Sequence, residues 1–181
     1  MKIDCWHDWK GRSKMLSRTE DLTQKHHGKV LIKLIHGISD LKMIDLGCGN
    51  KRCAALFTNY TGVDLPEFDV YESDLKFIED YDLVLMNAFI DVMKSPLKVL
   101  MMVLSNATKG SYVVLHRQEI TNQPTKTEKR DSYGGWTWHS MIYEKDFYQI
   151  LKQKRFVIKK RMSCGFVNWH NGGDSLLLKK I

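Results

Sequence analysis

The sequence lacks any long apolar run, and this absence limits its relation to membranes. The longest runs, such as Val99 to Leu104, fall far short of the roughly 20 residues that a spanning helix needs. The amino-terminal stretch MKIDCWHDWKGRSK mixes charges with aromatics and has no apolar core of the kind that secretory signals use. We therefore expect no membrane span and a cytoplasmic location.

The cysteines are few and poorly spaced for metal or disulfide chemistry. The four of them, at positions 5, 48, 53 and 164, form no CxxC pair and no zinc-finger pattern with histidine. Cys48 and Cys53 could suggest a redox pair, but packing is the favoured interpretation because free cysteine commonly behaves as a small hydrophobe. We expect reduced thiols and no metal site.

The charge of the chain is unevenly distributed. The net charge is +7, yet residues 41–119 hold 8 basic and 11 acidic side chains, while residues 120–162 hold 10 basic and 4 acidic ones. A polyphosphate site in the acidic centre is disfavoured, because P-loops add a lysine to their backbone cradle. A ligand portion that is cationic or uncharged suits this centre better.

Short apolar segments of strand type alternate with segments of helix type along the chain. This alternation predicts an α/β fold, a doubly wound, mainly parallel seven-stranded sheet with helices on both faces. The expected helices cover residues 19–38, 47–59 (turn and helix), 95–107 and 143–154, and the expected strands cover 41–46, 60–65, 68–74, 81–88, 109–117, 155–162 and 174–181.

The segments between the later elements predict two further features. Only eleven residues, 163–173, separate the last two strands. A parallel crossover needs a dozen or more residues, so we expect a C-terminal antiparallel β-hairpin. Residues 118–140 form the longest irregular stretch, and loops of that length are commonly binding loops or disordered segments.

A pair of glycines follows the first strand, as in nucleotide-binding α/β proteins. Gly47 and Gly49 match the start of the dinucleotide fingerprint, but its third glycine is missing, which weakens an NAD interpretation. Asp64 ends the second strand, where a carboxylate can take both hydroxyls of a ribose. Asp45 and Asp74 stand at two other strand ends. This pattern favours an adenosine that carries a positive tail.

Five segments in this order and spacing resemble the class I S-adenosylmethionine-dependent methyltransferases. They are DLGCGN (45–50), GVDL (62–65), ESDL (72–75), YDLVLMNAFIDVM (81–93) and KGSYVVL (109–115). The resemblance spans roughly residues 40–181 and implies S-adenosyl-L-methionine as the cofactor. The segment that begins LHRQEIT is similar, more loosely, to a poorly characterised methyltransferase subgroup found near surface-polysaccharide genes.

The resemblance also implies which residues bind the donor. It places the methionine moiety against the first glycine turn, the ribose hydroxyls on Asp64, the adenine amino group on Asp74, and the sulfonium near the end of the strand at 81–88. The full implied set is Asp45, Leu46, Gly47, Cys48, Gly49, Asp64, Leu65, Ser73, Asp74, Asn87 and Ala88.

The sequence departs from the family pattern at two places. Lys51 and Arg52 stand where a small residue is common, so both side chains must point away from a cationic ligand. The strand at 81–88 ends in NAFI and not in DPPY or NPPY, which lowers the case for methylation of the exocyclic amino groups of nucleic-acid bases.

Polar residues near two strand ends are candidates for an acceptor site. His116 and Arg117 close the strand at 109–117, Glu119 follows, and His139 lies in the aromatic loop. His139, His116 and Asp91 are the candidate general bases, which methyl transfer needs only if the acceptor is a hydroxyl or an ammonium. The structural alternatives are a hydrogen-bonded histidine and a helix cap. Aromatic residues that could cover the donor or line an acceptor site are Tyr133, Trp136, Trp138, Phe166 and Trp169.

We expect one methyltransferase domain over residues 1–181, with an N-terminal helical segment at 1–40, a donor-binding half at 41–116 and an acceptor-side half at 117–181. The expected reaction is methyl transfer to an oxygen or nitrogen of a small-molecule or glycan-type acceptor. The alternatives are an RNA or protein methyltransferase that docks through the basic residues of 152–161, a catalytically silent donor-binding subunit and, more distantly, an NAD-dependent reductase.

Overall fold

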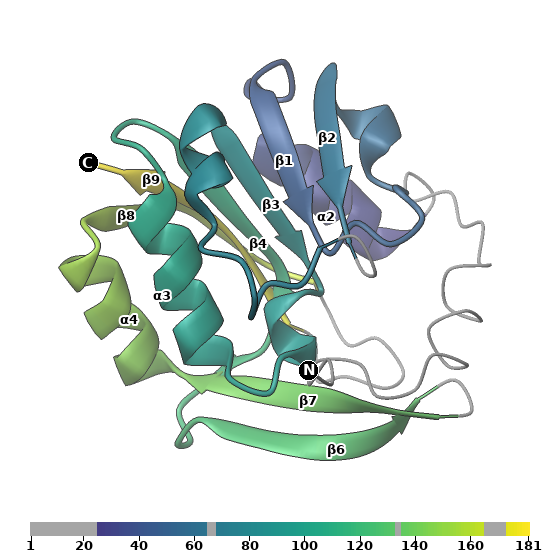
Figure 1. The fold of residues 1–181 in the computed structure, drawn as a ribbon, viewed down its shortest axis with the longest axis vertical. Coiled ribbons are helices and arrows are strands. Elements are labelled where there is room, and N and C mark those ends of the chain that lie inside the picture. The colour runs from purple at the N-terminus through teal and green to yellow at the C-terminus, as the bar shows by residue number, and fades with distance from the viewer. Residues whose placement is uncertain (1–24, 65–67, 133–134, 165–172) are drawn as a thin grey trace.

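The main sheet has six strands. The structure is a computed structural model that describes residues 25–64, 68–132, 135–164 and 173–181 (Figure 1). The strands lie in the order β2-β1-β3-β4-β9-β8. Their bounds are β1 Lys42–Leu46, β2 Asn59–Val63, β3 Leu83–Asn87, β4 Tyr112–Gln118, β8 Phe156–Ser163 and β9 Asp174–Lys180. β1 to β4 are parallel, and β9 is antiparallel to both β4 and β8.

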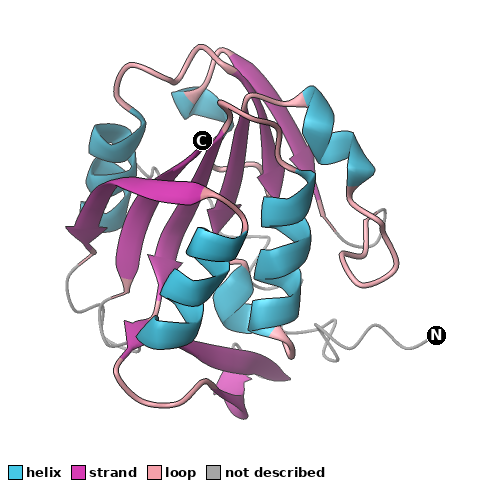
Figure 2. Cartoon of the chain, turned by 90° about the vertical axis from the view of Figure 1, so that its left-hand side faces the viewer, coloured by secondary structure: helices cyan, strands magenta, loops and turns pink. Residues whose placement is uncertain are grey.

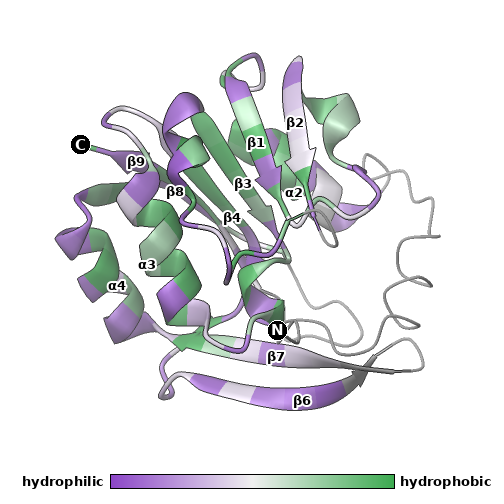
Figure 3. Cartoon of the chain, in the orientation of Figure 1, coloured by the Kyte–Doolittle hydropathy of each residue, from purple (hydrophilic) through white to green (hydrophobic). Residues whose placement is uncertain are grey.

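Helices cover both faces of this sheet. α2 (His26–Ile35) lies on one face, and α3 (Pro96–Asn106) and α4 (Glu144–Gln153) lie on the other (Figures 1 and 2). Because successive strand residues point to opposite faces, Leu83 packs in the core with α2, while Val84 packs in the core with α3 and α4. This two-sided burial explains the continuous apolar strands, which Figure 3 shows along β3.

Residues 118–140 differ from the irregular loop that the sequence predicts. They contain β5 (Ile120–Thr121), β6 (Lys126–Ser132) and most of β7 (Gly135–Tyr143), which form a second sheet in the order β5-β7-β6. Figure 1 shows β6 and β7 crossing the molecule at the end toward which the arrows of β1 and β2 point. β6 is polar throughout, so its strand character is hidden from a hydrophobic pattern.

The strand predicted at residues 68–74 is wrong, which leaves six strands in the described main sheet. Side-chain oxygens there accept hydrogen bonds from backbone N–H groups. Asp69 Oδ1 accepts one from Tyr71 at 2.9 Å, and Ser73 Oγ accepts one from Leu75 at 3.0 Å. Short polar side chains that bond to nearby backbone in this way compete with sheet pairing. The segment leads into a 3-10 turn, η3 (Lys76–Asp80).

The helix predicted after the glycine turn is also shorter than expected. The only helical piece there is the 3-10 turn η2 (Ala54–Leu56). The Ala54 N–H donates to the Lys51 oxygen and the Leu56 N–H to the Cys53 oxygen, the i to i+3 pattern of a 3-10 turn.

The helix predicted at residues 19–38 corresponds to α2, which covers His26–Ile35. The first part of the predicted range, residues 19–24, lies outside the described residues.

Candidate functional site

The glycine turn, residues 47–49, joins the ends of β1 and β2. The N–H groups of Gly47 and Cys48 both donate to the Val63 oxygen, at 2.9 and 3.2 Å. Gly47 and Gly49 have φ angles of +73° and +57°, which other residues rarely adopt. A Cβ on Gly47 would lie 2.3 Å from the ring of Phe89. The turn therefore needs glycine for its conformation and for its close contact with Phe89.

Asp64, which the sequence predicts at the end of the second strand, lies beside the glycine turn. The Gly49 N–H donates to Asp64 Oδ2 at 2.6 Å, so the carboxylate at the end of β2 is fixed against the turn that follows β1. Asp64 is half-buried. The bond leaves the carboxylate able to accept further hydrogen bonds, since a carboxylate has about four acceptor positions.

Asp45 is buried on β1 directly before the turn. Its Oδ2 accepts a hydrogen bond from the Tyr60 hydroxyl at 2.8 Å, while its Oδ1 is buried and accepts none from the described residues. Burial raises the pKa of Asp45 to about 7, the Tyr60 hydrogen bond opposes this rise, and the nearby charge of Asp64 adds to it. Tyr60 was missed from sequence, although it lies two residues before Gly62 on β2.

The end of β3 turns sharply toward the glycine turn. Ala88 has a φ of +49°, and its N–H donates to the His116 oxygen at 3.0 Å. Asn87 donates from Nδ2 to Cys53 Sγ at 3.3 Å, and its Oδ1 is buried without a partner among the described residues. The structure thus brings Asn87 and Ala88 to the same sheet edge as the glycine turn.

The remaining predicted donor-binding residues differ in their positions. Leu46 is fully buried in the core, Cys48 is a half-buried free thiol, and Leu65 lies outside the described residues. Ser73 and Asp74 lie in the turn before η3. Asp74 is exposed and pairs with Lys76 at 3.3 Å, and no hydrogen bond among the described residues joins it to the glycine turn, so its adenine role stays a prediction.

The two basic residues after the turn differ in exposure. Lys51 is exposed and Arg52 is half-buried. The outward position of Lys51 agrees with the expectation that it avoids a cationic ligand. Its φ of +58° belongs to the left-handed region, which lets the chain turn toward η2.

His116 lies in a buried network between β4, β8 and β9. Its Nδ1 is 2.7 Å from Ser175 Oγ, and Ser175 Oγ is also 2.7 Å from Cys164 Sγ. Burial raises the pKa of the Cys164 thiol, which makes it a poor nucleophile. These contacts favour a structural role for His116, joining three strands at their ends.

His139 lies on β7 in the described part of the chain and pairs with Glu119. Its Nε2 is 3.2 Å from Glu119 Oε2, and its side chain is only 4% exposed. Burial raises the pKa of Glu119, while the charge of Arg130 opposes this rise. The backbone N–H of Ile142 donates to the Glu119 oxygen at 2.9 Å, so β7 and the residues after β4 are fixed together.

Asp91 faces the same region from the 3-10 turn η4 (Ile90–Val92), which follows β3. Burial raises its pKa to about 6, the charge of Arg117 opposes this rise, and Glu119 adds to it. The Ser140 hydroxyl of β7 donates to the Met93 oxygen, which fixes β7 against η4. We call Asp91, Arg117, Glu119 and His139 the charged cluster.

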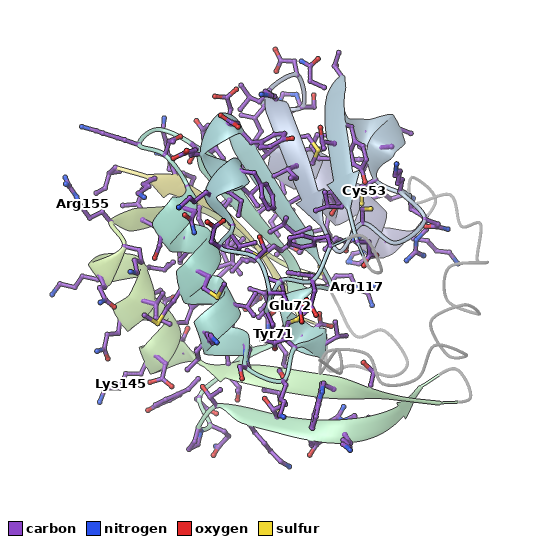
Figure 4. The ribbon with its side chains drawn as sticks, viewed as in Figure 1. Cys53, Tyr71, Glu72, Arg117, Lys145 and Arg155 are labelled. Carbon is purple, nitrogen blue, oxygen red and sulfur yellow. The ribbon has the colours of Figure 1, made fainter. Side chains whose placement is uncertain are left out.

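Arg117 reaches this cluster because of an irregularity in β4. The pairing of β4 with β9 shifts register between Leu115 and Gln118, and Arg117 has a φ of +63°. Such a bulge re-aims a side chain at the end of a strand. Figure 4 shows Arg117 near the lower ends of the central strands, on the side where β7 lies.

Comparison of the sequence with protein families and with curated proteins finds no match. Comparison of the structure with solved structures finds methyltransferases. The 1,6-didemethyltoxoflavin-N1-methyltransferase of Burkholderia thailandensis, solved with 1,6-didemethyltoxoflavin and S-adenosylhomocysteine, has a TM-score of 0.66 at 16% identity, covering 93% of this chain and 86% of that chain. The chain has the fold of S-adenosylmethionine-dependent methyltransferases.

Two further structures share this methyltransferase fold. A methyltransferase of Methanosarcina mazei has a TM-score of 0.59 at 16% identity, covering 84% of this chain and 97% of that chain. An amino pentose methyltransferase of Micromonospora echinaspora, solved with S-adenosylmethionine, has a TM-score of 0.56 at 10% identity. The match covers 97% of this chain and 98% of that chain.

Two further observations on the described residues concern membranes and metal ions. None of the helices they form is long and apolar enough to span a membrane. In the same residues, no group of three His, Cys, Asp or Glu side chains is placed to hold a metal ion.

The aromatic residues predicted to cover the donor or line an acceptor site are described only in part. Phe166, Trp169 and Tyr133 lie outside the described residues, so this role stays a prediction. Trp138 lies on β7, with Lys94 and Lys129 over its ring.

Proposed function

We propose that this chain transfers a methyl group from S-adenosylmethionine to an oxygen or nitrogen of a small-molecule or glycan-type acceptor. The observation that carries the proposal is the bond from the Gly49 N–H to Asp64. It joins a glycine turn after β1 to a carboxylate at the end of β2, at the sheet edge where doubly wound folds bind ligands. The methyltransferase fold supports the same conclusion.

The residues at this edge fit the proposed donor. Asp64 would hold the ribose hydroxyls, and the glycine turn would lie against the methionine moiety. The buried, unpartnered Oδ1 of Asp45 would accept a hydrogen bond from the donor's polar groups, directly or through water. Leu65, Ser73 and Asp74 are proposed for the adenosine, and Asn87 and Ala88 for the region near the sulfonium.

Methyl transfer from S-adenosylmethionine needs no covalent intermediate with the protein. When bound, S-adenosylmethionine supplies an activated methyl group. The chain has to align an acceptor lone pair with the S–CH3 bond and exclude water, and such alignment can lower the barrier by roughly 7 to 11 kcal/mol in favourable cases. If the acceptor carries a proton, His139 and Asp91 are the proposed bases, whereas the network around His116 makes that residue the weakest of the three candidates.

The acceptor class is supported by three of the solved neighbours. Those enzymes are methyltransferases of 1,6-didemethyltoxoflavin, of an amino pentose and of magnesium protoporphyrin IX. The basic residues that would favour RNA or protein lie partly on β8, which forms the edge of the sheet opposite β2. Arg161, one of them, is already paired with Glu144 and Asp174.

Calorimetric titration of one sample with S-adenosylmethionine, S-adenosylhomocysteine and NAD tests the proposal. We expect saturable binding of the first two and none of NAD. Tight binding of NAD with no response to the other two would contradict the proposal. Methylation of any member of an acceptor panel would exclude the silent-subunit alternative, and absence of RNA binding at low salt would exclude the RNA alternative.

A further inference from the structure

Two hydrogen bonds hold β7 against the segments that carry the charged cluster. The Ser140 hydroxyl holds β7 to the Met93 oxygen after η4, and the Ile142 N–H holds it to the Glu119 oxygen. Groups from three separate elements then interact: His139 of β7 contacts Glu119, which lies between β4 and β5, and the charge of Glu119 acts on Asp91 of η4.

One carboxylate oxygen of Asp91 has no hydrogen-bond partner among the described residues. This oxygen, Oδ1, is buried. Arg117 lies near enough to influence the carboxylate, but no ion pair within 4.0 Å joins the two in the described part of the chain. Buried polar atoms are almost always hydrogen-bonded, and one without a partner costs free energy. The orphaned oxygen therefore indicates a ligand that donates to it.

The charges of the cluster indicate the sign of that ligand. Within the cluster, two carboxylates, Asp91 and Glu119, lie near one guanidinium, Arg117. Outside it, Arg130 and Glu128 act on Glu119 with opposite charges. While His139 is neutral, the cluster carries an excess negative charge in buried surroundings, where charges interact more strongly than in water. Such a site attracts a cation and repels a carboxylate or a phosphate.

We infer that the acceptor is an aliphatic amine that enters as its ammonium and donates an N–H to Asp91 Oδ1. This inference rests on the proposed methyl transfer and narrows its acceptor from oxygen or nitrogen to amine nitrogen. An ammonium has no lone pair, so it must first lose a proton. His139 takes that proton, and Glu119 is a positioning residue that orients the imidazole and stabilises the imidazolium.

The bonds of the transfer step then balance. The freed lone pair of the amine forms the N–CH3 bond as the S–CH3 bond breaks, and the electron pair of the broken bond goes to sulfur. The product is a methylated ammonium together with a neutral thioether, S-adenosylhomocysteine. The proton held by His139 returns to solvent when the product leaves.

Three probes that share one ring but differ in charge test the inference. Benzylamine, benzyl alcohol and benzoate are titrated by calorimetry into protein saturated with S-adenosylhomocysteine. We expect saturable binding of benzylamine alone. Stronger binding of the alcohol or of benzoate, or no saturable heat from any probe, would overturn the inference. If S-adenosylhomocysteine itself does not bind, the proposed function fails first, so the two failures are distinct.

Variants distinguish loss of the cation-binding site from a general loss of folding or of donor binding. Asp91→Asn is expected to weaken benzylamine binding about 10- to 100-fold, as loss of a hydrogen bond to a charged group predicts, without changing the affinity for S-adenosylhomocysteine. Glu79→Gln, which neutralises an exposed carboxylate on η3, is the matched control and should change neither. Unchanged benzylamine affinity in Asp91→Asn would overturn the inference.

The role of Glu119 has its own test. Glu119→Gln should weaken benzylamine binding, and Glu119→Asp should restore part of it because the carboxylate is retained. Equal losses in the two variants, or no loss in Glu119→Gln, would remove the positioning role that we assign to Glu119.

Discussion

The glycine turn and the charged cluster lie at the same end of the sheet but are built in different ways. The turn uses backbone N–H groups of consecutive residues, and one carboxylate, Asp64, completes it. The cluster uses side chains that come from η4, from the end of β4 and from β7. A site made of neighbouring residues and glycines can be recognised from sequence, whereas a site made of distant side chains depends on how the strands pair.

Gly47→Ala should produce the largest effect on the glycine turn. The new Cβ would lie 2.3 Å from the Phe89 ring at a φ of +73°. We expect a loss of about 1–3 kcal/mol from overpacking and about 1–2 kcal/mol from the left-handed backbone, measured by urea unfolding. Gly37→Ala is the matched control, because its φ is +84° and nothing lies within 4 Å of its Cβ. Equal losses in the two variants would contradict the close contact with Phe89.

Asp45 should make stability depend on pH. Its pKa rises from 3.8 to about 7 on folding, so the folded state holds an extra proton between these values. Stability should therefore fall as pH rises from about 4 to about 7, by at most about 4 kcal/mol, at 1.36 kcal/mol per pKa unit. The raised pKa of Asp91, about 6, acts in the same direction.

Asp45→Asn isolates this contribution. The difference in unfolding free energy between the variant and the parent protein should shift in favour of the variant as pH rises through this window. Chemical denaturation at pH 4 and pH 8 measures the difference. A difference that stays constant across this range would show that folding does not raise the pKa of Asp45, and would contradict the predicted effect of its burial.

Asp64→Ala tests the side chain that completes the glycine turn. We expect affinity for S-adenosylhomocysteine to fall about 10- to 100-fold, because hydrogen bonds to a charged group contribute roughly 1.5–3 kcal/mol. Asp80→Ala removes an exposed carboxylate of η3 and should leave affinity unchanged. Calorimetry measures both, and intact affinity in Asp64→Ala would remove the ribose assignment.

Ser140→Ala should have the smallest effect, and it acts on the charged cluster. It removes the hydroxyl that holds β7 to the Met93 oxygen, and a buried hydrogen bond contributes about 1 kcal/mol. Ser105→Ala removes a similar bond to the Met101 oxygen on the exposed side of α3 and should cost less. Thermal unfolding compares them. If the two losses are the same, the anchor on β7 does not hold the cluster together.

The position of the glycine turn could be predicted from the sequence because each of its signals is local, while its role in donor binding stays a prediction. Gly47, Gly49 and Asp64 are separated from their strands by no more than a few residues, and parallel strands end at the same edge. The long apolar strands β3 and β4 were predicted for the same reason, since burial on both faces leaves continuous hydrophobic runs.

The charged cluster could be predicted only in part. His139 and Asp91 were candidates from their residue types, but the pairing with Glu119 depends on β7 lying against the end of β4. Most of β7 falls in the stretch predicted as an irregular loop, and its partner β6 is polar and charged and gives no strand pattern. The bulge at Arg117 and the anchor at Ser140 leave no signal in the sequence, because both arise from strand pairing between distant segments.

Hydrogen–deuterium exchange with and without S-adenosylhomocysteine tests the central claim most directly. We expect slower exchange in the peptides that contain the glycine turn and Asp64, and no such change when NAD replaces S-adenosylhomocysteine. Binding of S-adenosylhomocysteine with protection confined to other segments, or with no protection at all, would contradict the donor site at this edge of the sheet.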